Sequence, residues 1–175
     1  MQPVEIQLVL KDEAATQQFA QCCAEQIQSI FCSDSPSIFW HLQGDLGAGK
    51  SFFSRALLQA FVPGMKVKSP TYTLVESYKV PIQSGSLTVH HFDLYRLCDP
   101  EELEYLAIRD LLQGPFLALI EWPQKAEPLL PLPDLILHLE AKESARHALL
   151  QGISETGQRL IELMKPHLPA DFLPR

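Results

Sequence analysis

The segment from Gly44 to Ser51 reads GDLGAGKS and fits the pattern G-x-x-x-x-G-K-[ST]. In this pattern the backbone amides of a glycine-rich loop surround the phosphates of a nucleotide. The two fixed glycines allow backbone angles closed to other residues, so that successive N–H groups can point inward and form an anion-binding nest. The lysine adds a positive charge at the β- and γ-phosphates, and the serine offers a hydroxyl to Mg²⁺. The motif therefore predicts a nucleoside triphosphate site formed by Gly44, Asp45, Leu46, Gly47, Ala48, Gly49, Lys50 and Ser51.

Two acidic residues follow apolar segments of strand length. Asp93 comes directly after Leu87–Phe92, and Glu121 comes directly after Phe116–Ile120. In open α/β sheets, ligands bind at the carboxyl ends of the strands. Hydrolysis of a nucleotide needs an acid that fixes Mg²⁺ and a group that positions water, in addition to the phosphate loop. Asp93 and Glu121 are therefore the candidates for these two roles.

Other residues near these segments have both a functional and a structural interpretation. Trp122 could stack near the nucleotide or cap the core. Thr71 lies in a loop where it could sense the γ-phosphate or simply form a turn. Neighbouring residues of a strand face opposite sides, so His90 and His91 cannot both reach one metal ion. We interpret the two as ordinary strand histidines.

The loop is flanked by the elements that the motif requires. Ser37–Leu42 is an apolar, β-prone segment, and in Lys50–Phe61 the apolar residues recur at helical spacing. A helix that begins at the loop would direct its dipole and unpaired amides at the phosphates. The runs Thr73–Val80 and Leu87–Phe92, separated by Gln83–Ser86, predict a hairpin.

The predicted elements together indicate the fold class, and hydrophobic spacing and capping residues predict where the remaining elements lie. An antiparallel hairpin beside parallel strands makes the sheet mixed, so we expect an α/β fold, a P-loop NTPase-like three-layer sandwich with a mixed central sheet. Residues 1–165 are expected to form one P-loop domain, and 166–175 a C-terminal tail. The further strands are expected at Val4–Leu10, Phe116–Ile120, Leu135–Leu139 and His147–Ile153, and the further helices from Asp12–Glu13 onward, from Asp99 to about Tyr105, and at Thr156–Met164.

Composition narrows the class of protein. The chain has 175 residues, a formal net charge of −7 and no cluster of lysines and arginines, so a partner would have to hold most of any RNA that is involved. Its four cysteines show no C-x-x-C spacing, which favours reduced thiols in the cytoplasm. No apolar stretch approaches membrane-spanning length, and the N-terminus does not have the pattern of a signal peptide. We therefore expect a cytoplasmic protein without a membrane segment.

Five segments together carry a resemblance to a known family. In order along the chain they are GDLGAGKS, VKSPTYTLVESY, HFDLYRL, EELEYLAIRDL and LIEWPQKA. The set resembles the TsaE (YjeE) family of bacterial ATPases over about residues 5 to 160, and is far more specific than the P-loop alone. The resemblance implies an ATPase needed for N6-threonylcarbamoyladenosine, the modified base beside the anticodon of tRNA. It also implies TsaD and TsaB as protein partners, with TsaD carrying the transfer chemistry.

The resemblance also implies residue roles. Lys50 would hold the phosphates of ATP, and Ser51 and Glu121 would bind Mg²⁺. Asp93 would orient or activate the attacking water, or hold the metal through water. Trp122 matches the tryptophan that follows the family's glutamate, and Arg146 resembles an arginine near the nucleotide. Hydrolysis, slow in the isolated chain, would reset the TsaB–TsaD assembly between rounds of modification.

Three positions depart from the family pattern. Phe52 stands where members usually have a second threonine, which removes a polar side chain near the phosphates. Ala107 stands where glycine is common, and Gln124 where an acid is frequent. These changes bear on nucleotide affinity and on partner contacts.

Three alternative functions are compared with what the sequence contains. A small P-loop kinase would add an arginine-bearing lid and an acceptor pocket, and neither can be identified. A GTPase would need the asparagine of N-K-x-D, and the chain contains no asparagine. A nucleotide-gated interaction module, in which binding rather than turnover is the signal, stays open, with Pro70–Glu76 and the acidic helix from Pro100 as its docking face.

Overall fold

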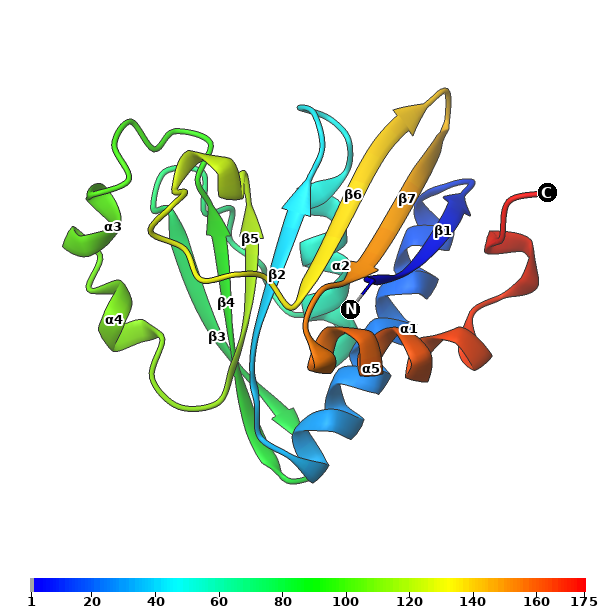
Figure 1. Cartoon of the computed structure of the whole chain (residues 1–175), viewed down its shortest axis with the longest axis horizontal. Helices are drawn as coiled ribbons and strands as arrows, with labels where there is room; N and C mark the ends of the chain where they lie inside the picture. Colours follow the sequence, from blue (N-terminus) through cyan, green and yellow to red (C-terminus); the bar gives the residue numbers. More distant parts are fainter. Residues whose placement is uncertain (1) are drawn as a thin grey trace.

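The computed structural model describes residues 2–175, which fold around one seven-stranded sheet (Figure 1). The strands lie in the order β1-β7-β6-β2-β5-β4-β3. Their bounds are β1 Val4–Leu10, β2 Ser37–Gln43, β3 Val75–Ile82, β4 Gly85–Asp93, β5 Phe116–Glu121, β6 Leu135–Lys142 and β7 Ala145–Gly152.

The sheet is mixed, as the sequence predicts. The four central strands β6, β2, β5 and β4 run parallel to one another, whereas β1, β7 and β3 pair antiparallel at the two sides. The predicted hairpin is present as β3 and β4, with Gln83 and Ser84 between the strands. Because the central strands are parallel, β2, β4, β5 and β6 end at one edge of the sheet. At this edge the P-loop follows β2, and the two candidate acids are the last residues of β4 and β5.

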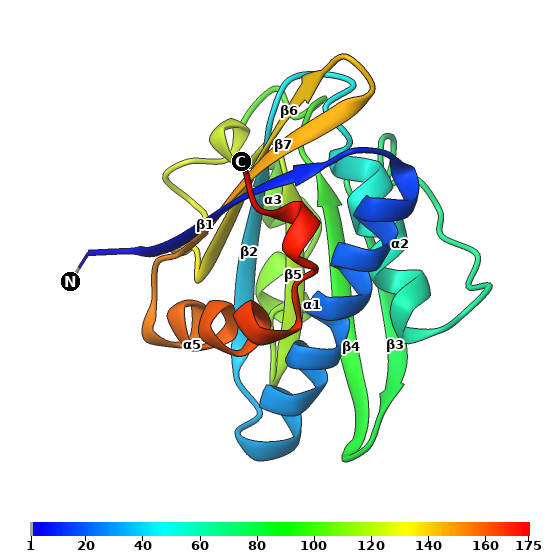
Figure 2. The ribbon, with the colours of Figure 1, turned by 90° about the vertical axis from the view of Figure 1, so that its right-hand side faces the viewer.

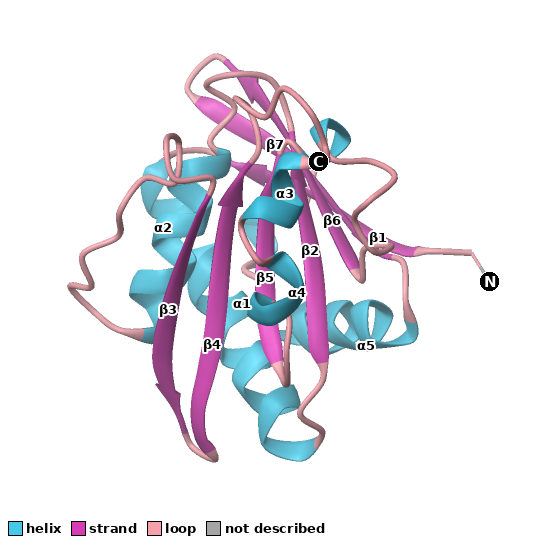
Figure 3. Cartoon of the chain, turned by 90° about the vertical axis from the view of Figure 1, so that its left-hand side faces the viewer, coloured by secondary structure: helices cyan, strands magenta, loops and turns pink. Residues whose placement is uncertain are grey.

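Helices cover both faces of the sheet, which gives the three expected layers. The long helices α1 (Glu13–Ser33), α2 (Lys50–Phe61) and α5 (Glu155–Met164) lie on one face (Figure 2). The single-turn helices α3 (Glu102–Tyr105) and α4 (Ile108–Leu111) lie on the other (Figure 3). Three short 3₁₀ turns complete the chain, η1 (Pro123–Lys125), η2 (Lys165–His167) and η3 (Ala170–Phe172).

Two hydrophobic clusters form the core, one on each face. The larger packs α1, α2 and α5 against the sheet, and the smaller lies beneath α3 and α4. Every residue of β5 is buried, which is why its sequence is apolar without alternation. On β4 and β5 the odd-numbered residues face α2 and the even-numbered ones face α3 and α4, as Val89 and Phe92 illustrate.

Local capping explains where the helices begin. The carboxylate of Asp12 accepts a hydrogen bond from the Ala15 amide at 2.8 Å and starts α1. Before α3, the Asp99 amide donates to the Glu102 carboxylate at 2.9 Å, but the Asp99 carboxylate accepts from the Glu101 amide rather than from the Glu102 amide. The helix itself begins at Glu102 and lasts one turn.

Near its C-terminus the chain returns to the sheet, where Phe172 is buried in the larger cluster. Within residues 2–175, no helix is both long enough and apolar enough to cross a membrane.

Candidate functional site

The P-loop connects the end of β2 to the start of α2, and its glycines have the positive φ angles that such a loop needs. Gly44, Gly47 and Gly49 have φ values of 146°, 79° and 104°. A Cβ on Gly44 would also collide with the carbonyl oxygen of Leu139 in β6. The first glycine of the motif is therefore required both by its backbone angle and by close contact with the neighbouring strand.

Lys50 is the first residue of α2 and is buried beneath the loop. Its ammonium donates hydrogen bonds to the carbonyl oxygens of Gly44 and Asp45, the latter at 2.9 Å. The Nζ atom also lies 4.4 Å from the centre of the Trp122 ring, a cation–π distance. Burial lowers the pKa of Lys50, and the carboxylates of Glu121, Asp93 and Asp45 oppose this effect. The positive charge is thus fixed at the base of the loop.

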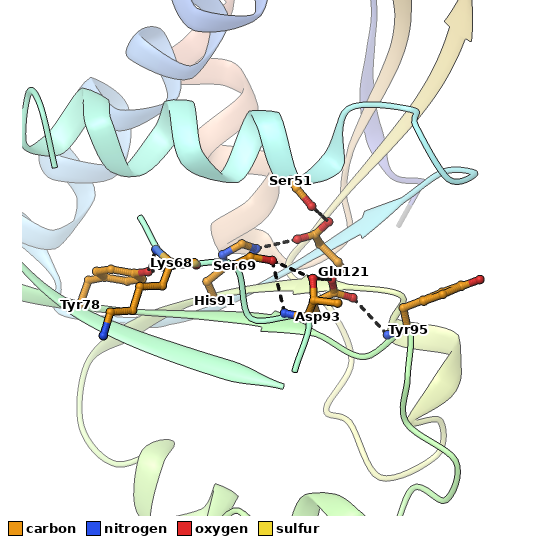
Figure 4. A network of polar contacts seen from close by, with 9 residues as sticks. Ser51, Lys68, Ser69, Tyr78, His91, Asp93, Tyr95 and Glu121 are labelled. Atoms are coloured by element: carbon orange, nitrogen blue, oxygen red, sulfur yellow. Dashed lines mark hydrogen bonds and ion pairs between the residues drawn. The ribbon is translucent and has the colours of Figure 1, made fainter. Parts of the chain in front are cut away.

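Glu121 is the last residue of β5 and lies beside Ser51 on the first turn of α2 (Figure 4). The Ser51 hydroxyl donates to Glu121 Oε1 at 2.8 Å. The other carboxylate oxygen, Oε2, lies 2.6 Å from Nε2 of His91. A hydroxyl and a carboxylate are hard oxygen donors of the kind that Mg²⁺ prefers, and their adjacency fits an ion bound together with phosphates.

Asp93 ends β4 and is paired with Glu121 across the two parallel strands. Its Oδ1 accepts a hydrogen bond from the Tyr95 amide at 3.1 Å. Burial raises the pKa of Asp93, with the neighbouring Glu121 charge adding to the shift and the Tyr95 amide opposing it. Two carboxyl groups from separate strands therefore stand side by side at the end of the sheet.

The loop between α2 and β3 brings Thr71 to this pair. Its hydroxyl lies 2.7 Å from that of Ser69 and 3.5 Å from Asp93 Oδ2. The loop is anchored by Tyr78, whose hydroxyl accepts from the Lys68 amide at 2.9 Å and donates to the Lys68 carbonyl. The sequence leaves open whether Thr71 senses the γ-phosphate or forms a simple turn. Its position beside the two acids is compatible with γ-phosphate contact.

These groups open into a cavity of about 690 Å³. Its wall contains Lys50, Ser51, Asp93, Glu121, Trp122 and Arg146, together with P-loop residues Leu46, Gly47, Ala48 and Gly49. Gly44 and Asp45 do not line it; their carbonyl oxygens hold Lys50 from behind instead.

Arg146, at the start of β7, lies over the P-loop. Its Nη2 is 3.5 Å from the Gly47 carbonyl oxygen, and its Nε is the atom nearest to where a Cβ on Gly49 would be. The family resemblance implies an arginine near the nucleotide at this position, and in the structure Arg146 lines the cavity although it is almost one hundred residues from the P-loop in the sequence.

Several residues of the site were missed by sequence reasoning. The sequence favours an ordinary strand histidine at His91, although this residue lies two positions before Asp93 and therefore on the same face. The cavity is also lined by Asp12, Glu13 and Thr16 at the start of α1. No local pattern marks those three, because only the packing of α1 against α2 brings them to the P-loop.

Comparisons with known proteins identify the family and the fold. Residues 10–148 match the family described as "Threonylcarbamoyl adenosine biosynthesis protein TsaE". A protein of Haemophilus influenzae named "tRNA threonylcarbamoyladenosine biosynthesis protein TsaE" is 38% identical over 152 residues, which cover 87% of this chain and 92% of the relative. A protein of the same name from Bacillus subtilis is 31% identical over 127 residues, or 72% of this chain and 77% of the relative. The crystal structure of Bacillus subtilis YdiB superposes with a TM-score of 0.71 at 21% identity, covering 95% of this chain and 98% of that chain, which shows the fold.

Proposed function

The chain belongs to the TsaE family, whose named members serve tRNA threonylcarbamoyladenosine biosynthesis, and from this premise we propose that it is an Mg²⁺-dependent ATPase of that pathway. In this proposal it acts with TsaB and TsaD in the cytoplasm, and its hydrolysis of ATP resets their complex between rounds. The observation that carries the ATPase proposal is the convergence of Lys50, Ser51, Asp93 and Glu121 on one cavity at the end of the sheet.

The P-loop and Lys50 would bind the triphosphate. The amides at the start of α2 point along the helix axis toward the loop, where they and the helix dipole favour an anion. The Lys50 ammonium has three donors, and two of them hold loop carbonyls. The third remains for the β- and γ-phosphates.

Ser51 and Glu121 would hold the Mg²⁺ ion through Oγ and Oε1. When bound, Mg²⁺ would neutralise charge on the phosphate oxygens. The Ser51 hydroxyl proton, which now points at Glu121 Oε1, would turn away so that both oxygens can face the ion.

Asp93 would position the attacking water. Within residues 2–175, the hydrogen bond that its Oδ2 accepts is a long one, from the Thr71 hydroxyl at 3.5 Å. A water bound to Oδ2 gives its proton to the carboxylate as its oxygen bonds to the γ-phosphorus. The bond from that phosphorus to the β-phosphate oxygen breaks, and ADP and phosphate leave. The raised pKa of Asp93 makes its carboxylate a better proton acceptor than an ordinary aspartate.

The charge of the chain supports the assignment of tRNA to the partners. With a net charge of −7 and no basic cluster, this protein offers little attraction to a phosphate backbone. Its contribution to the pathway would then be the energy of ATP hydrolysis rather than the binding of RNA.

The test is to measure ATP hydrolysis and base modification for the chain alone and with TsaB and TsaD. We expect slow hydrolysis without any acceptor, faster hydrolysis with the partners, and modification only in the full mixture. If the chain releases no phosphate from ATP without a small-molecule acceptor, either alone or with the partners, the ATPase proposal is wrong and a kinase is favoured.

The variant Asp93→Ala separates turnover from binding. It should still bind ATP but lose hydrolysis and repeated rounds of modification. Glu162→Ala, which removes an exposed acid of α5, is the matched control and should behave like the unmodified chain. Full modification by Asp93→Ala without hydrolysis would show that nucleotide binding is the signal.

A further inference from the structure

The contact between His91 and Glu121 is the best-buried polar pair of the site. His91 Nε2 and Glu121 Oε2 are 2.6 Å apart, and each side chain is only 2% exposed. Figure 4 shows the ring of His91 directed at the carboxylate, on the side away from Ser51.

The chemistry of the pair fixes the direction of the bond. An ionised carboxylate can only accept, so Nε2 of His91 carries the proton and donates it to Oε2. The other ring nitrogen, Nδ1, is buried and has no hydrogen-bond partner within residues 2–175. A buried nitrogen without a partner costs free energy, and an apolar side chain would avoid that cost. The contact with Glu121 is therefore the one polar interaction that the ring makes in the described chain.

Strand geometry explains why His91 reaches Glu121. Asp93 is opposite Glu121 in the parallel β4–β5 pair, and His91 is opposite Leu119. All four residues share the face that packs against α2, and the imidazole extends along the strand to the next carboxylate on that face.

The neighbouring His90 shows the contrast. It faces the opposite cluster, where its Nδ1 pairs with the Ser77 hydroxyl at 2.7 Å. The two histidines share one strand, similar burial and similar chemistry, but only His91 touches the candidate metal ligand.

Each oxygen of Glu121 thus has its own partner, Ser51 at Oε1 and His91 at Oε2. The carboxylate has no freedom to rotate about its terminal bond without breaking one of them. Because the imidazole holds Oε2, Oε1 is the oxygen that faces Ser51 and any metal ion that the Ser51 hydroxyl binds.

We propose that His91 is a positioning residue for the metal ligand: it holds Glu121 Oε2 so that Oε1 faces Ser51 and an Mg²⁺ ion bound with the nucleotide. This rests on the proposed function, because it takes Glu121 as a ligand of Mg²⁺. His91 acts through Glu121 and touches neither the nucleotide nor the ion.

The test is the coupling between Mg²⁺ and ADP, measured by calorimetry as the ratio of ADP affinities in excess Mg²⁺ and in EDTA. The variants are His91→Leu, which removes the donor, and two amides of different reach. Glutamine places its amide nitrogen close to the position of the histidine Nε2, whereas asparagine is one carbon too short to reach Glu121.

We expect His91→Leu and His91→Asn to reduce the Mg²⁺ enhancement of ADP affinity about tenfold or more, the usual effect of losing an outer-shell partner. Affinity for ADP in EDTA should stay within about twofold, because no phosphate contact changes. His91→Gln should retain most of the enhancement. The matched control, His90→Leu, should retain all of it.

A double-mutant comparison checks that His91 acts through Glu121. In a Glu121→Ala background, His91→Asn should cause no further loss of Mg²⁺ coupling, because the group that it positions is gone. An additive further loss would overturn the proposal. So would normal coupling in His91→Asn, or equal losses in the glutamine and asparagine variants.

The unmodified chain distinguishes this inference from the proposed function. If it binds ADP with no response to Mg²⁺, both the metal site and the role of His91 are wrong. If it shows strong coupling that the His91 variants keep, the Mg²⁺ site stands and only the positioning role is rejected. Should His91→Leu fail to fold, the two amide variants still decide the question.

Discussion

At the scale of single residues, the site depends on a lysine that is held before any ligand arrives. Lys50 donates to two loop carbonyls and lies against the Trp122 ring. A flexible lysine loses side-chain entropy when it is fixed, and here that loss is already part of folding. The ammonium is therefore preorganised for the phosphate binding that we propose.

Lys50→Ala should weaken ADP binding by about tenfold to a hundredfold, the usual worth of a hydrogen bond to a charged group. The fold should persist, because α2 gains a good helix former. Calorimetry measures the binding, and circular dichroism checks the fold. Unchanged affinity in a folded variant would contradict the role of Lys50.

A second residue, His41, links stability to pH. It lies buried on β2, and burial lowers its pKa from 6.5 to about 4. Below pH 6.5, His41 binds a proton in the unfolded chain but not in the folded chain. The free energy of unfolding therefore falls as the pH drops toward 4. Between pH 7.5 and 5 this residue should remove about 2 kcal/mol from the free energy of unfolding.

Urea denaturation at both pH values measures this effect. In His41→Leu, the loss of stability between pH 7.5 and 5 should be smaller by about 2 kcal/mol than in the unmodified chain. His167→Gln, which changes an exposed histidine, should leave the loss unaltered. Equal pH dependence in all three proteins would show that His41 titrates normally.

At the scale of elements, α5 is attached to the sheet by a small set of close contacts. Ser154 caps the helix by accepting from the Gly157 amide, and its hydroxyl donates to Asp134 Oδ1 at 2.6 Å. Asp134 Oδ2 in turn accepts from the Phe39 amide of β2. This arrangement requires the first turn of α5 to lie against the Asp134 backbone, which only a glycine at 157 permits.

Gly157→Ala should therefore destabilise the protein, although alanine is the better helix former. Its Cβ would collide with the Asp134 carbonyl, so α5 must shift, and overpacking of this kind costs about 1 to 3 kcal/mol. Denaturation with urea measures the change. Gln158→Ala is the neighbouring control and should change stability by less than about 0.5 kcal/mol. A stabilised Gly157→Ala would show that α5 moves freely.

At the scale of the whole molecule, the cavity joins segments from most of the chain. The start of α1, the P-loop, the ends of β4 and β5, and the β6–β7 turn all contribute to its wall. A ligand bound there contacts only the folded state, since the unfolded chain does not bring these segments together. Nucleotide binding should therefore stabilise the entire domain.

Mg-ADP at one hundred times its dissociation constant should raise the free energy of unfolding by about 2.7 kcal/mol. For a chain of this size that corresponds to a rise in Tm of about 5 to 11 °C. Thermal unfolding followed by circular dichroism measures the shift, and EDTA should reduce it. In Lys50→Ala, whose affinity is expected to be lower, the same ligand concentration should raise the free energy of unfolding by only about 0.4 to 1.4 kcal/mol. No rise in the unmodified chain would argue against nucleotide binding.

Local sequence determined most of the elements and the chemistry of the site. The P-loop, the strand before it and the helix after it are contiguous, so spacing and turn residues specify them without long-range information. Asp93 and Glu121 could be singled out because each follows an apolar strand. The two carboxylates lie close together because β4 and β5 pair in parallel, an arrangement that the order of elements implies.

Only the tertiary structure decided which distant residues complete the site. The contact of His91 with Glu121 depends on the register of β4 against β5, and the approach of Arg146 to the loop depends on the pairing of β6 and β7. The start of α1 reaches the cavity only because α1 packs against α2. Short-range spacing specifies an element and its faces. Strand register and helix packing, in contrast, are selected by the folded core as a whole. Register and packing bring remote side chains within hydrogen-bonding distance.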